Sequence, residues 1–549
     1  MRRRVAGVSV LAVAAGMAVG VPAHAAGDYR TVTREGVVLQ VDRVPVSVTS
    51  VKGSGATRSD FDGDGVDDVA ASADPYEHSL PQSPGGLVVV RYSSTPYVDY
   101  LATAVSPVGG GCVCFGEILA TGDFDGDGYD DLAAGEYDTT VNVHAGGVWV
   151  IPGSSSGLRI DSAKYFTQSS PGVPGASERE DRFGSALAAG DINGDGRDDL
   201  AIGAYGEAIG SLGEAGAVTV LYGGTGGLTA TGAQQLHQDQ AAVPGSAEKG
   251  DHFGWTLAIG KVDNNRYADL VIGAPQENSN SSSTGSGMLT LMWGSASGVK
   301  LSGATSVTGA ALRGATGRSD SYVWDLGMAL AVGDVNGDGL GEVVAGAPNA
   351  QSPKGNEGMV AVFTGRSGGL SSSAVKLFSQ RTAGVPGDPE AGDLFGATLA
   401  VGDVTGDGRA DVLVGAPGEA IGTKAEAGTI ALLKGSASGL TGTGAQGFDQ
   451  DHAVVPGGAE RGDRFGGAVA LLNLNGTGPL DALVASPGEA VTGDPAGLSS
   501  GSVAVFHGGS GGLVPQATSW SGLSLRTDVV WPLWYGRRLA AAQTGGLNY

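Results

Sequence analysis

The chain has 549 residues, of which 98 are glycine and only 16% are charged. Glycine is thus well above its usual share of about 7%, without the every-third-residue period of collagen. With 32 basic against 57 acidic side chains the net charge is −25, which argues against nucleic acid and anionic membranes as partners. The 41% of apolar residues also argues against a disordered chain, so we expect a β-rich protein with many turns.

The first 25 residues have the pattern of a secretory signal peptide. Three arginines, Arg2 to Arg4, precede an apolar run from Val5 to Val21, and Ala23 and Ala25 supply the small residues of a cleavage site. The run is too short and too weakly flanked for a good transmembrane helix. We therefore expect cleavage after Ala25, a secreted protein without a membrane span, and an N-terminal lead segment over residues 26–51.

An acidic, glycine-rich loop recurs seven times at intervals of 63 to 73 residues. Eight residues before six of these loops lies an apolar residue followed by glycine, as in Phe395-Gly396. Four residues after the last acid of most loops comes Gly-Ala-Pro or a variant of it, as in Gly415-Ala416-Pro417. The loops begin at Asp60, Asp123, Asp191, Lys261, Asp334, Asp403 and Asn473.

Each copy predicts four short β-strands. The first strand leads from the Phe-Gly pair into the acidic loop, and the second leads from the loop to Gly-Ala-Pro. A third apolar run, such as Gly358 to Thr364, is followed by a glycine-serine turn and a weaker fourth strand. Four-stranded units repeated radially form a β-propeller, which manages its strand edges through ring closure. A helical solenoid is the alternative architecture, but no long stretch has the 3.6-residue period that it needs.

This series of motifs resembles the FG-GAP repeats of the integrin alpha-chain N-terminal propeller and its bacterial relatives. The resemblance covers about residues 52 to 543, and we assign residues 52–549 to the propeller. It implies an all-β fold of seven four-stranded antiparallel blades, with calcium in the loops between the first and second strands. The first copy departs from the pattern, because Lys52 stands where phenylalanine is expected.

The two ends of the repeat region are expected to share one blade. The first copy lacks its Phe-Gly strand, whereas Tyr535-Gly536 begins a spare one and no acidic loop follows at Gln543. We predict that Tyr535 to Ala542 forms the innermost strand of blade 1, beside Val66 to Ala73, and so closes the ring. Closure would hide two strand edges that otherwise invite aggregation.

Five of the loops present alternating oxygen-bearing side chains around a curl that glycine permits. Such hard ligands, completed by one main-chain carbonyl, suit Ca²⁺. An EF-hand is excluded because its loop position 12 requires glutamate, where Ala71 and Ala134 stand. We predict about five structural calcium ions, with the ligands Asp60, Asp62, Asp64, Val66 and Asp68; Asp123, Asp125, Asp127, Tyr129 and Asp131; Asp191, Asn193, Asp195, Arg197 and Asp199; Asp334, Asn336, Asp338, Leu340 and Glu342; and Asp403, Thr405, Asp407, Arg409 and Asp411.

The other two loops are expected to be empty. In the fourth loop Lys261 replaces the first ligand, and we expect its ammonium group to take the place of a cation. The seventh loop retains a single carboxylate, Asp481, and begins with Asn473. Metal is assigned to the other five because clustered carboxylates without a cation repel one another.

Two familiar motifs are better explained by the repeats. The tripeptide Arg461-Gly462-Asp463 lies in a linker whose other copies carry Lys249 or Ala391 at the arginine position, so we do not expect adhesion through it. The segment from Gly153 to Gly157 matches a serine-hydrolase turn, but its recurrence in other copies indicates a hairpin turn.

The histidines and cysteines define no catalytic or metal cluster. His252 and His452 lie in equivalent linkers with acidic neighbours, and we expect both on a solvated surface. Cys112 and Cys114 are separated by one residue, and a local disulfide, two free thiols or contact with a partner all stay open.

Two classes of function follow. The first is a secreted, calcium-binding, integrin-like propeller that acts, as a monomer, as a non-catalytic binding, adhesion or scaffold module for an extracellular protein or glycan. The alternative is an extracellular propeller associated with a phospholipase-type hydrolase, as in some relatives of the family. We favour the first, because seven repeats occupy almost all of the chain and no nucleophile and base stand out.

Binding is expected on the face opposite the acidic loops. Antiparallel strands reverse at each turn, so the acidic loops and glycine-serine hairpins share one face, and the inter-blade linkers and second-to-third-strand loops share the other. Variable loops on a rigid frame are where binding usually resides. The longest of these loops run over Tyr205 to Ala215, Gln276 to Ser286, Gly418 to Ala427 and Gly488 to Gly501.

Overall fold

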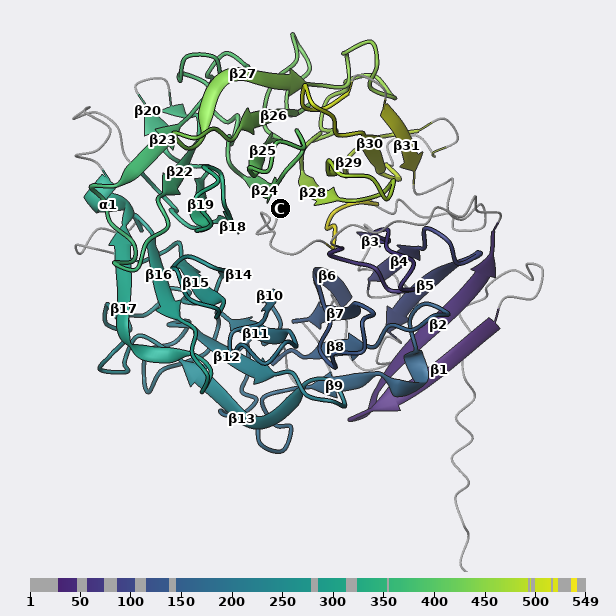
Figure 1. Cartoon of the computed structure of the whole chain (residues 1–549), viewed down its shortest axis with the longest axis vertical. Helices are drawn as coiled ribbons and strands as arrows, with labels where there is room; N and C mark the ends of the chain where they lie inside the picture. Colours follow the sequence, from purple (N-terminus) through teal and green to yellow (C-terminus); the bar gives the residue numbers. More distant parts are fainter. Residues whose placement is uncertain are drawn as a thin grey trace, which may run out of the picture.

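A computed structural model describes residues 28–46, 57–73, 86–103, 115–137, 145–277, 285–312, 323–352, 355–491, 494, 499–514, 517–521 and 535–540. Within these ranges the chain consists of strands β1 to β31, one α-helical turn, α1 (Gly309–Leu312), and one 3-10 turn, η2 (Ile160–Ser162). The strands form seven antiparallel blades around a central axis (Figure 1). The seven-bladed all-β propeller is therefore confirmed.

Blades 2 to 7 share one plan, in which the first strand lies nearest the axis and each later strand lies further out (Figure 1). Blade 5 also carries a small hairpin, β20 (Gln351–Ser352) with β21 (Gly355–Asn356). Blade 2 comprises β6 (Phe115–Gly122), β7 (Asp131–Glu136), β8 (Val148–Ile151) and β9 (Lys164–Phe166), and blade 3 comprises β10 (Ala186–Gly190), β11 (Asp199–Ala204), β12 (Ala217–Tyr222) and β13 (Thr229–Leu236). Blade 4 comprises β14 (Thr256–Gly260), β15 (Asp269–Ala274), β16 (Met288–Trp293) and β17 (Lys300–Thr308), and blade 5 comprises β18 (Ala329–Gly333), β19 (Glu342–Ala347), β22 (Met359–Phe363) and β23 (Val375–Phe378). Blade 6 comprises β24 (Thr398–Gly402), β25 (Asp411–Ala416), β26 (Thr429–Lys434) and β27 (Thr441–Phe448), and blade 7 comprises β28 (Ala468–Leu472), β29 (Asp481–Ser486), β30 (Ser502–Phe506) and β31 (Ala517–Ser521).

The core lies between the blades rather than within one of them. The second strand of each blade is buried along its whole length, as in β15, because both of its faces pack against neighbouring blades. One apolar cluster, for example, joins Val218 and Val220 of β12 to Leu257 and Ile259 of β14. Sheets that pack face to face in this way read as continuous apolar runs instead of alternating ones.

The Phe-Gly pair docks each blade onto the one before it. Phe253 is fully buried, and its backbone N–H donates to the carbonyl of Ala215 in the preceding blade at 3.0 Å. A Cβ on Gly216 would lie 2.2 Å from the Phe253 carbonyl oxygen, so only glycine fits at this contact. The same backbone bond to the preceding blade recurs at Phe183, Leu326, Phe395, Phe465 and Tyr535.

Residues from both termini build blade 1, as predicted. The segment from Tyr535 to Ala540 lies along β3 (Val69–Ala73), and β3 is followed outward by β4 (Leu87–Arg91) and β5 (Tyr97–Thr103). Three backbone hydrogen bonds of 2.8 to 2.9 Å join this segment to Ala70 and Ser72. Closure of the ring by the C-terminal segment is confirmed for residues 535–540, which pair with β3 through an isolated β-bridge between Leu539 and Ala71 rather than as a regular strand. Residues 541 and 542 lie outside the described residues, and β3 begins at Val69 rather than Val66.

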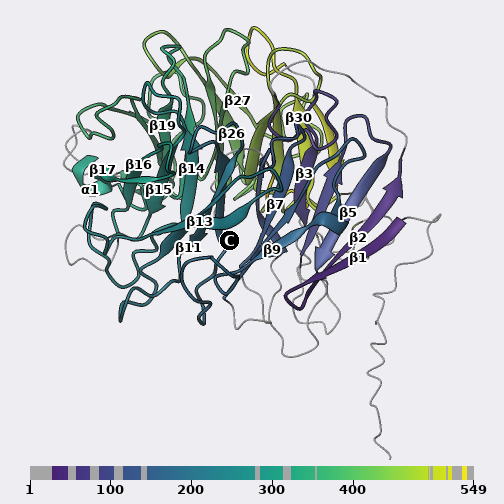
Figure 2. The ribbon, with the colours of Figure 1, turned by 60° about the horizontal axis from the view of Figure 1, so that its bottom comes forward.

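An N-terminal hairpin extends blade 1 outward. Strand β2 (Val37–Pro45) pairs with β5, and β1 (Asp28–Arg34) forms the outer edge, which lies on the rim of the ring (Figure 2). Arg43 makes two hydrogen bonds to Asp99 at 2.6 and 2.7 Å, and it also donates to the Leu158 carbonyl of blade 2 at 3.1 Å. The lead segment therefore ties blade 1 to blade 2.

The minor motifs have structural roles. Asp463 of the Arg-Gly-Asp tripeptide is only 1% exposed, and Ser154 of the serine-rich segment closes a turn by donating to the Gly157 carbonyl at 2.7 Å. The expectation of a solvated His252 is wrong, because its ring is half-buried and stacks on Trp255 with a centroid distance of 5.3 Å. Burial lowers the pKa of His252.

Some predictions fall on residues that are not described. The signal peptide, Lys52, Cys112 and Cys114 lie outside the described residues, so those predictions stay as they are. Among the residues that are described, no helix is both long and apolar enough to cross a membrane.

Ring closure can be tested with a pair of tyrosine variants. Tyr535 is fully buried between blades 7 and 1, whereas Tyr29 on β1 is 54% exposed. We expect Tyr535→Ala to lower the free energy of unfolding by about 3–5 kcal/mol because it leaves a cavity, and Tyr29→Ala to change it by about 0.5 kcal/mol or less. Urea unfolding measures both, and equal effects of the two variants would contradict closure by the C-terminal segment.

Candidate metal centres

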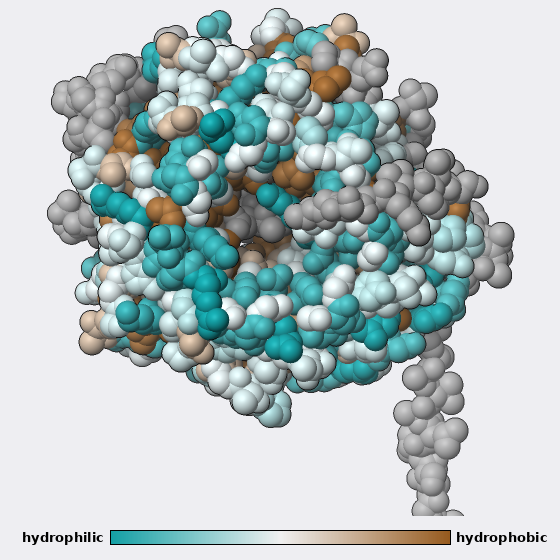
Figure 3. Space-filling model, viewed as in Figure 1, coloured by the Kyte–Doolittle hydropathy of each residue, from teal (hydrophilic) through white to brown (hydrophobic). Residues whose placement is uncertain are grey.

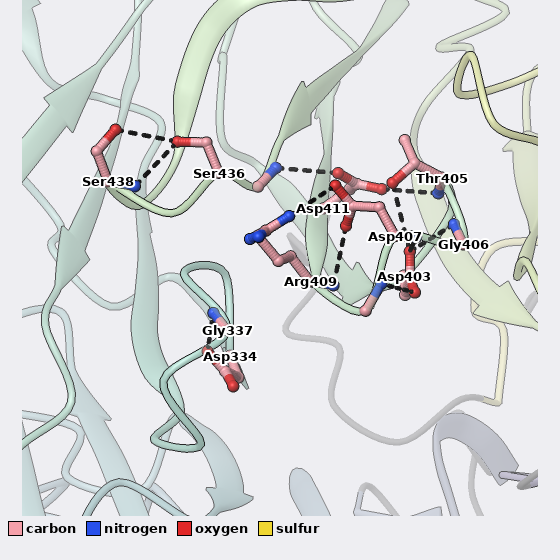
Figure 4. Close-up of polar contacts among 12 residues, drawn as sticks. Asp334, Gly337, Asp403, Thr405, Gly406, Asp407, Arg409, Asp411, Ser436 and Ser438 are labelled. Carbon is pink, nitrogen blue, oxygen red and sulfur yellow. Dashed lines mark hydrogen bonds and ion pairs between the residues drawn. The ribbon is translucent and has the colours of Figure 1, made fainter.

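Each acidic loop joins the first strand of a blade to the second, at the end of the antiparallel pair. In blade 6, for example, Gly402 at the end of β24 pairs with Asp411 at the start of β25. The chain must therefore reverse within eight residues while it keeps its polar groups satisfied. Figure 4 shows this loop, in which Asp403, Asp407 and Asp411 lie close together.

The first aspartate of the loop organises the reversal. Asp403 accepts three backbone N–H groups of its own loop at 2.6 to 3.1 Å, from Gly406, Asp407 and Gly408. The two glycines have φ angles of 70° and 83°, which side chains rarely tolerate. The same three bonds recur at Asp60, Asp123, Asp191 and Asp334.

The last acid of the loop ties it to the neighbouring hairpin. Asp411 accepts the N–H groups of Val404 and Thr405 and, at 2.9 Å, that of Gly435 in the turn between β26 and β27. These contacts place the acidic loops and the glycine-serine hairpins on one face. Burial raises the pKa of the equivalent acids, to about 8 for Asp131 and about 7 for Asp199 and Glu342.

The site in blade 1 brings three carboxylates together. Oxygen atoms of Asp60, Asp62 and Asp68 all lie within 4.8 Å of one another, and all three residues are buried. One oxygen of Asp62 is buried without a hydrogen-bond donor. Burial raises the pKa of Asp60 to about 6, and burial together with the charge of Asp62 raises the pKa of Asp68 well above its usual value. A hard cation would satisfy the free oxygen and offset this repulsion.

Blade 2 holds the second group of this kind. Oxygen atoms of Asp123, Asp125 and Asp127 lie within 4.8 Å of one another, at a more exposed position. Burial and the charge of Asp127 raise the pKa of Asp125. The donor set of both blades is all oxygen, which fits the chemistry of Ca²⁺.

Blades 3, 5 and 6 have the same loop with fewer carboxylates, and within the described residues no further group of three converges. In blade 5 the amide nitrogen of Asn336 donates to Glu342 at 2.8 Å, so the longer glutamate side chain still reaches the loop. Arg197 and Arg409 lie 3.5 and 3.1 Å from Asp195 and Asp407. The sites in these blades stay predictions.

The main chain at the predicted carbonyl ligands is held in place. At Val66, Tyr129, Arg197, Leu340 and Arg409 the backbone N–H donates to the loop carboxylate two residues earlier, at 2.9 to 3.1 Å. These bonds close the same turn in all five loops. Coordination by the five carbonyl oxygens stays a prediction.

The fourth and seventh loops differ from the other five. Lys261 is exposed, and within the described residues no ion pair joins it to Asp263 or Asp269, so the geometry gives no support to an ammonium group that replaces the cation. In the seventh loop, buried oxygens of Asn473 and Asp481 lack a donor. That both loops are empty stays a prediction.

A ring of hydrogen bonds between the loops is the feature that sequence reasoning missed. The eighth residue of every loop donates its backbone N–H to the carbonyl of the first residue in the preceding loop, at 2.6 to 2.9 Å. In three loops the eighth residue is aspartate, and its carboxylate also accepts the N–H of that first residue. The doubled acids Asp67-Asp68, Asp130-Asp131 and Asp198-Asp199 are the sequence signal of this contact.

The fold and these loops define a seven-bladed β-propeller with oxygen-rich loops on one face. The FG-GAP repeat family matches residues 115–151, 183–221, 253–292, 326–363 and 395–433, which are blades 2 to 6. The chain therefore contains five FG-GAP repeats. Blade 7, in which the motif is degraded, has the same four-stranded sheet, and blade 1 has a five-stranded sheet that includes the N-terminal hairpin.

Known proteins with similar sequences fall into two groups. Phosphatidylinositol-glycan-specific phospholipase D of Bos taurus is 29% identical over 426 residues, covering 74% of this chain and 47% of that protein. Integrin alpha-PS2 of Drosophila melanogaster is 32% identical over 237 residues, covering 42% of this chain and 16% of that protein. This chain thus spans about half the length, or less, of these homologues.

Among solved structures, a rhamnogalacturonan lyase of Bacillus licheniformis matches 90% of this chain and 73% of its own length. Its sequence identity is 11% and the TM-score is 0.32. A likeness at this level carries no argument about this protein.

Two variants in the blade 6 loop separate loop structure from ion binding. Asp403 accepts three N–H groups, whereas Asp407 accepts one backbone N–H and is more exposed. In excess EGTA we expect Asp403→Ala to lower the free energy of unfolding by about 1–2 kcal/mol and Asp407→Ala by about 0.5 kcal/mol or less. Urea unfolding measures this difference, and equal losses would show that Asp403 does not organise the loop.

Proposed function

We propose that this protein is a secreted, monomeric, calcium-stabilised propeller that acts as a binding or scaffold module for an extracellular protein or glycan. The observation that carries the calcium assignment is the group of Asp60, Asp62 and Asp68, with its buried, donor-free oxygen. Its counterpart in blade 2 and the shared loop geometry support the other sites. Integrin alpha chains among the homologues support a role in binding.

The five proposed ions are structural. They lie where the first two strands of a blade turn, next to the backbone bonds that link neighbouring loops. At about 1 mM Ca²⁺, a site with a dissociation constant of about 10 μM adds about 2.7 kcal/mol to the free energy of unfolding. Because carboxylates must be ionised to bind the metal, this contribution falls as protons compete at low pH.

A hydrolase-associated role is the second candidate. It rests on the match between 74% of this chain and a phospholipase D. In this case the propeller would serve as the non-catalytic part of a phospholipase-type assembly. Capture of a phospholipase-type hydrolase from extracellular material by the purified chain would favour the second candidate, and capture of a non-enzymatic protein or a glycan without such a hydrolase would favour the first.

The proposed binding face carries the inter-blade linkers and the loops between second and third strands. Backbone contacts place the linkers and these loops on the same face. The N–H of Phe395, at the end of a linker, donates to the carbonyl of Glu357, in the loop just before β22. The ring face shown in Figure 3 is largely hydrophilic, and its apolar residues are scattered.

Calcium content and stability test the metal assignment. We expect about five ions per chain, one fewer in Asp127→Ala, and no change in Lys261→Ala. The melting temperature should rise by several degrees in about 1 mM Ca²⁺ relative to EGTA, because each filled site stabilises the folded state. Metal analysis and calorimetry measure these effects. An unchanged melting curve after verified metal removal would end the proposal.

The binding face can be tested with two matched pairs of charge changes. Asp388 and Glu390 are exposed in a linker, whereas Ser155 and Ser297 are exposed in hairpins on the other face. With a ligand identified by pull-down from extracellular material, we expect Asp388→Lys with Glu390→Lys to weaken binding about tenfold or more, and Ser155→Lys with Ser297→Lys to leave it unchanged. The opposite pattern, with both proteins folded, would place binding on the hairpin face.

A further inference from the structure

Four glutamine–glutamate pairs recur on the linker face, outside the acidic loops. In each pair the glutamine amide nitrogen donates to the glutamate carboxylate, at 2.6 Å in the first two, and the partners are always 39 residues apart. The glutamines are 2 to 7% exposed. The pairs are Gln168–Glu207, Gln238–Glu277, Gln380–Glu419 and Gln450–Glu489.

Each pair joins two neighbouring blades. Gln450, for example, follows the outer strand β27 of blade 6, and Glu489 lies beyond β29 of blade 7. Gly457 in the same linker, with φ of 97°, packs against both side chains, and a Cβ there would lie 3.1 to 3.2 Å from them. The pair is therefore enclosed by the linker between the two blades.

The surroundings of each glutamate are acidic. Next to every pair lies a second acidic residue, an aspartate that is at most 1% exposed, such as Asp463 beside Glu489. Within the described residues, the groups that face the four glutamates are Gln168, Gln235, Asp181 and Glu178; Gln238, Asp251 and Glu248; Gln380, Asp393, Glu390 and Asp388; and Gln450, Asp463, Glu460 and Asp494. No basic side chain is among them.

The glutamine amide oxygens show that each of these sites lacks a hydrogen-bond donor. In all four pairs the amide oxygen is buried without a hydrogen-bond donor. It belongs to the same amide group whose nitrogen donates to the glutamate. An ionised carboxylate cannot donate to it, and a buried acceptor without a donor costs about 1–3 kcal/mol. A proton on the glutamate would remove this deficit and the repulsion from the aspartate together.

We propose that each of the four pairs takes up one proton as the pH falls through neutrality, forming a carboxylic acid hydrogen-bonded to a carboxamide. The glutamate O–H donates to the glutamine oxygen, and the glutamine N–H donates to the other carboxyl oxygen. A cation is the alternative occupant. Within the described residues, however, carboxylates converge for a metal only in two acidic loops on the opposite face.

The consequence is a pH-dependent bond between blades. Burial raises the pKa of Glu207, Glu277, Glu419 and Glu489 to about 7, above the value of about 4.3 in an unfolded chain. The folded state therefore holds protons that the unfolded state has released. The stabilisation is complete below about pH 4.3 and is lost as the pH rises through about 7. Bonds between blades on the linker face weaken in that range.

Glutamine substitution tests the proposal, because a second amide reproduces the neutral acid. The variant carries Glu207→Gln, Glu277→Gln, Glu419→Gln and Glu489→Gln and is compared with the unaltered chain in saturating Ca²⁺. We expect potentiometric titration between about pH 8.5 and about pH 5.5 to show about four fewer protons taken up. We also expect the melting temperature of the variant at about pH 8.5 to equal or exceed that of the unaltered chain.

Glu357→Gln is the matched control, since Glu357 is also buried but forms an ion pair with Arg381. It should lower the melting temperature at every pH in this range. If the fourfold variant does not fold, Glu419→Gln alone should take up about one proton fewer. Destabilisation of the variant at about pH 8.5, unchanged proton uptake, or loss of a bound metal ion relative to the unaltered chain would each overturn the proposal.

Discussion

The contact between two glycines at the blade junctions is the constraint on which the rest of the ring depends. A Cβ on Gly203 would lie 2.2 Å from the carbonyl oxygen of Gly254 in the next blade, and one on Gly415 would lie 2.3 Å from that of Gly466. Close-packed interiors have no room for a methyl group at such distances. The Phe-Gly and Gly-Ala-Pro motifs are therefore two sides of one contact, and each is explained only by the presence of the other.

This close approach of the inner strands also brings the acidic loops together. Glycine contacts hold the second strand of one blade against the start of the first strand of the next. The acidic loops at the other end of these strands lie within hydrogen-bond distance and form a continuous ring. The junction of blades 7 and 1 departs from the rule, since Ala485 occupies the glycine position. There the carboxylate of Asp67 reinforces the contact, accepting the N–H of Asn473 at 2.6 Å. The carboxylates of Asp130 and Asp198 make the same bond at the junctions of blades 1–2 and 2–3.

Features that repeat could be predicted from the sequence, because one copy of a motif informs the others. The period is enough to predict the number of blades, the plan of each sheet and the closing segment at Tyr535. The role of the lead segment could not be predicted, since pairing of β2 with β5 is a single event without a second copy. For Lys261 the sequence supplies a positive charge but not the group that this charge contacts, and the residue is exposed. The constant spacing of 39 residues between glutamine and glutamate was a usable signal.

Carboxylates gather on both faces of the ring, and the group proposed to neutralise them is Ca²⁺ in the acidic loops and a proton on the linker face. The junction between blades 4 and 5 shows which linker-face junctions require that proton. Between blades 4 and 5 Ala350 stands at the position of the glutamate, and the acid at this junction is the half-buried Asp325. Gln276 and Asn349 donate to separate oxygens of Asp325 at 2.9 and 2.8 Å. One acid with two amides is satisfied as an anion, so this junction requires no proton. Where two acids share one amide, ionisation of both leaves an acceptor without a donor. The count of acids against amides at a junction therefore decides whether it responds to pH.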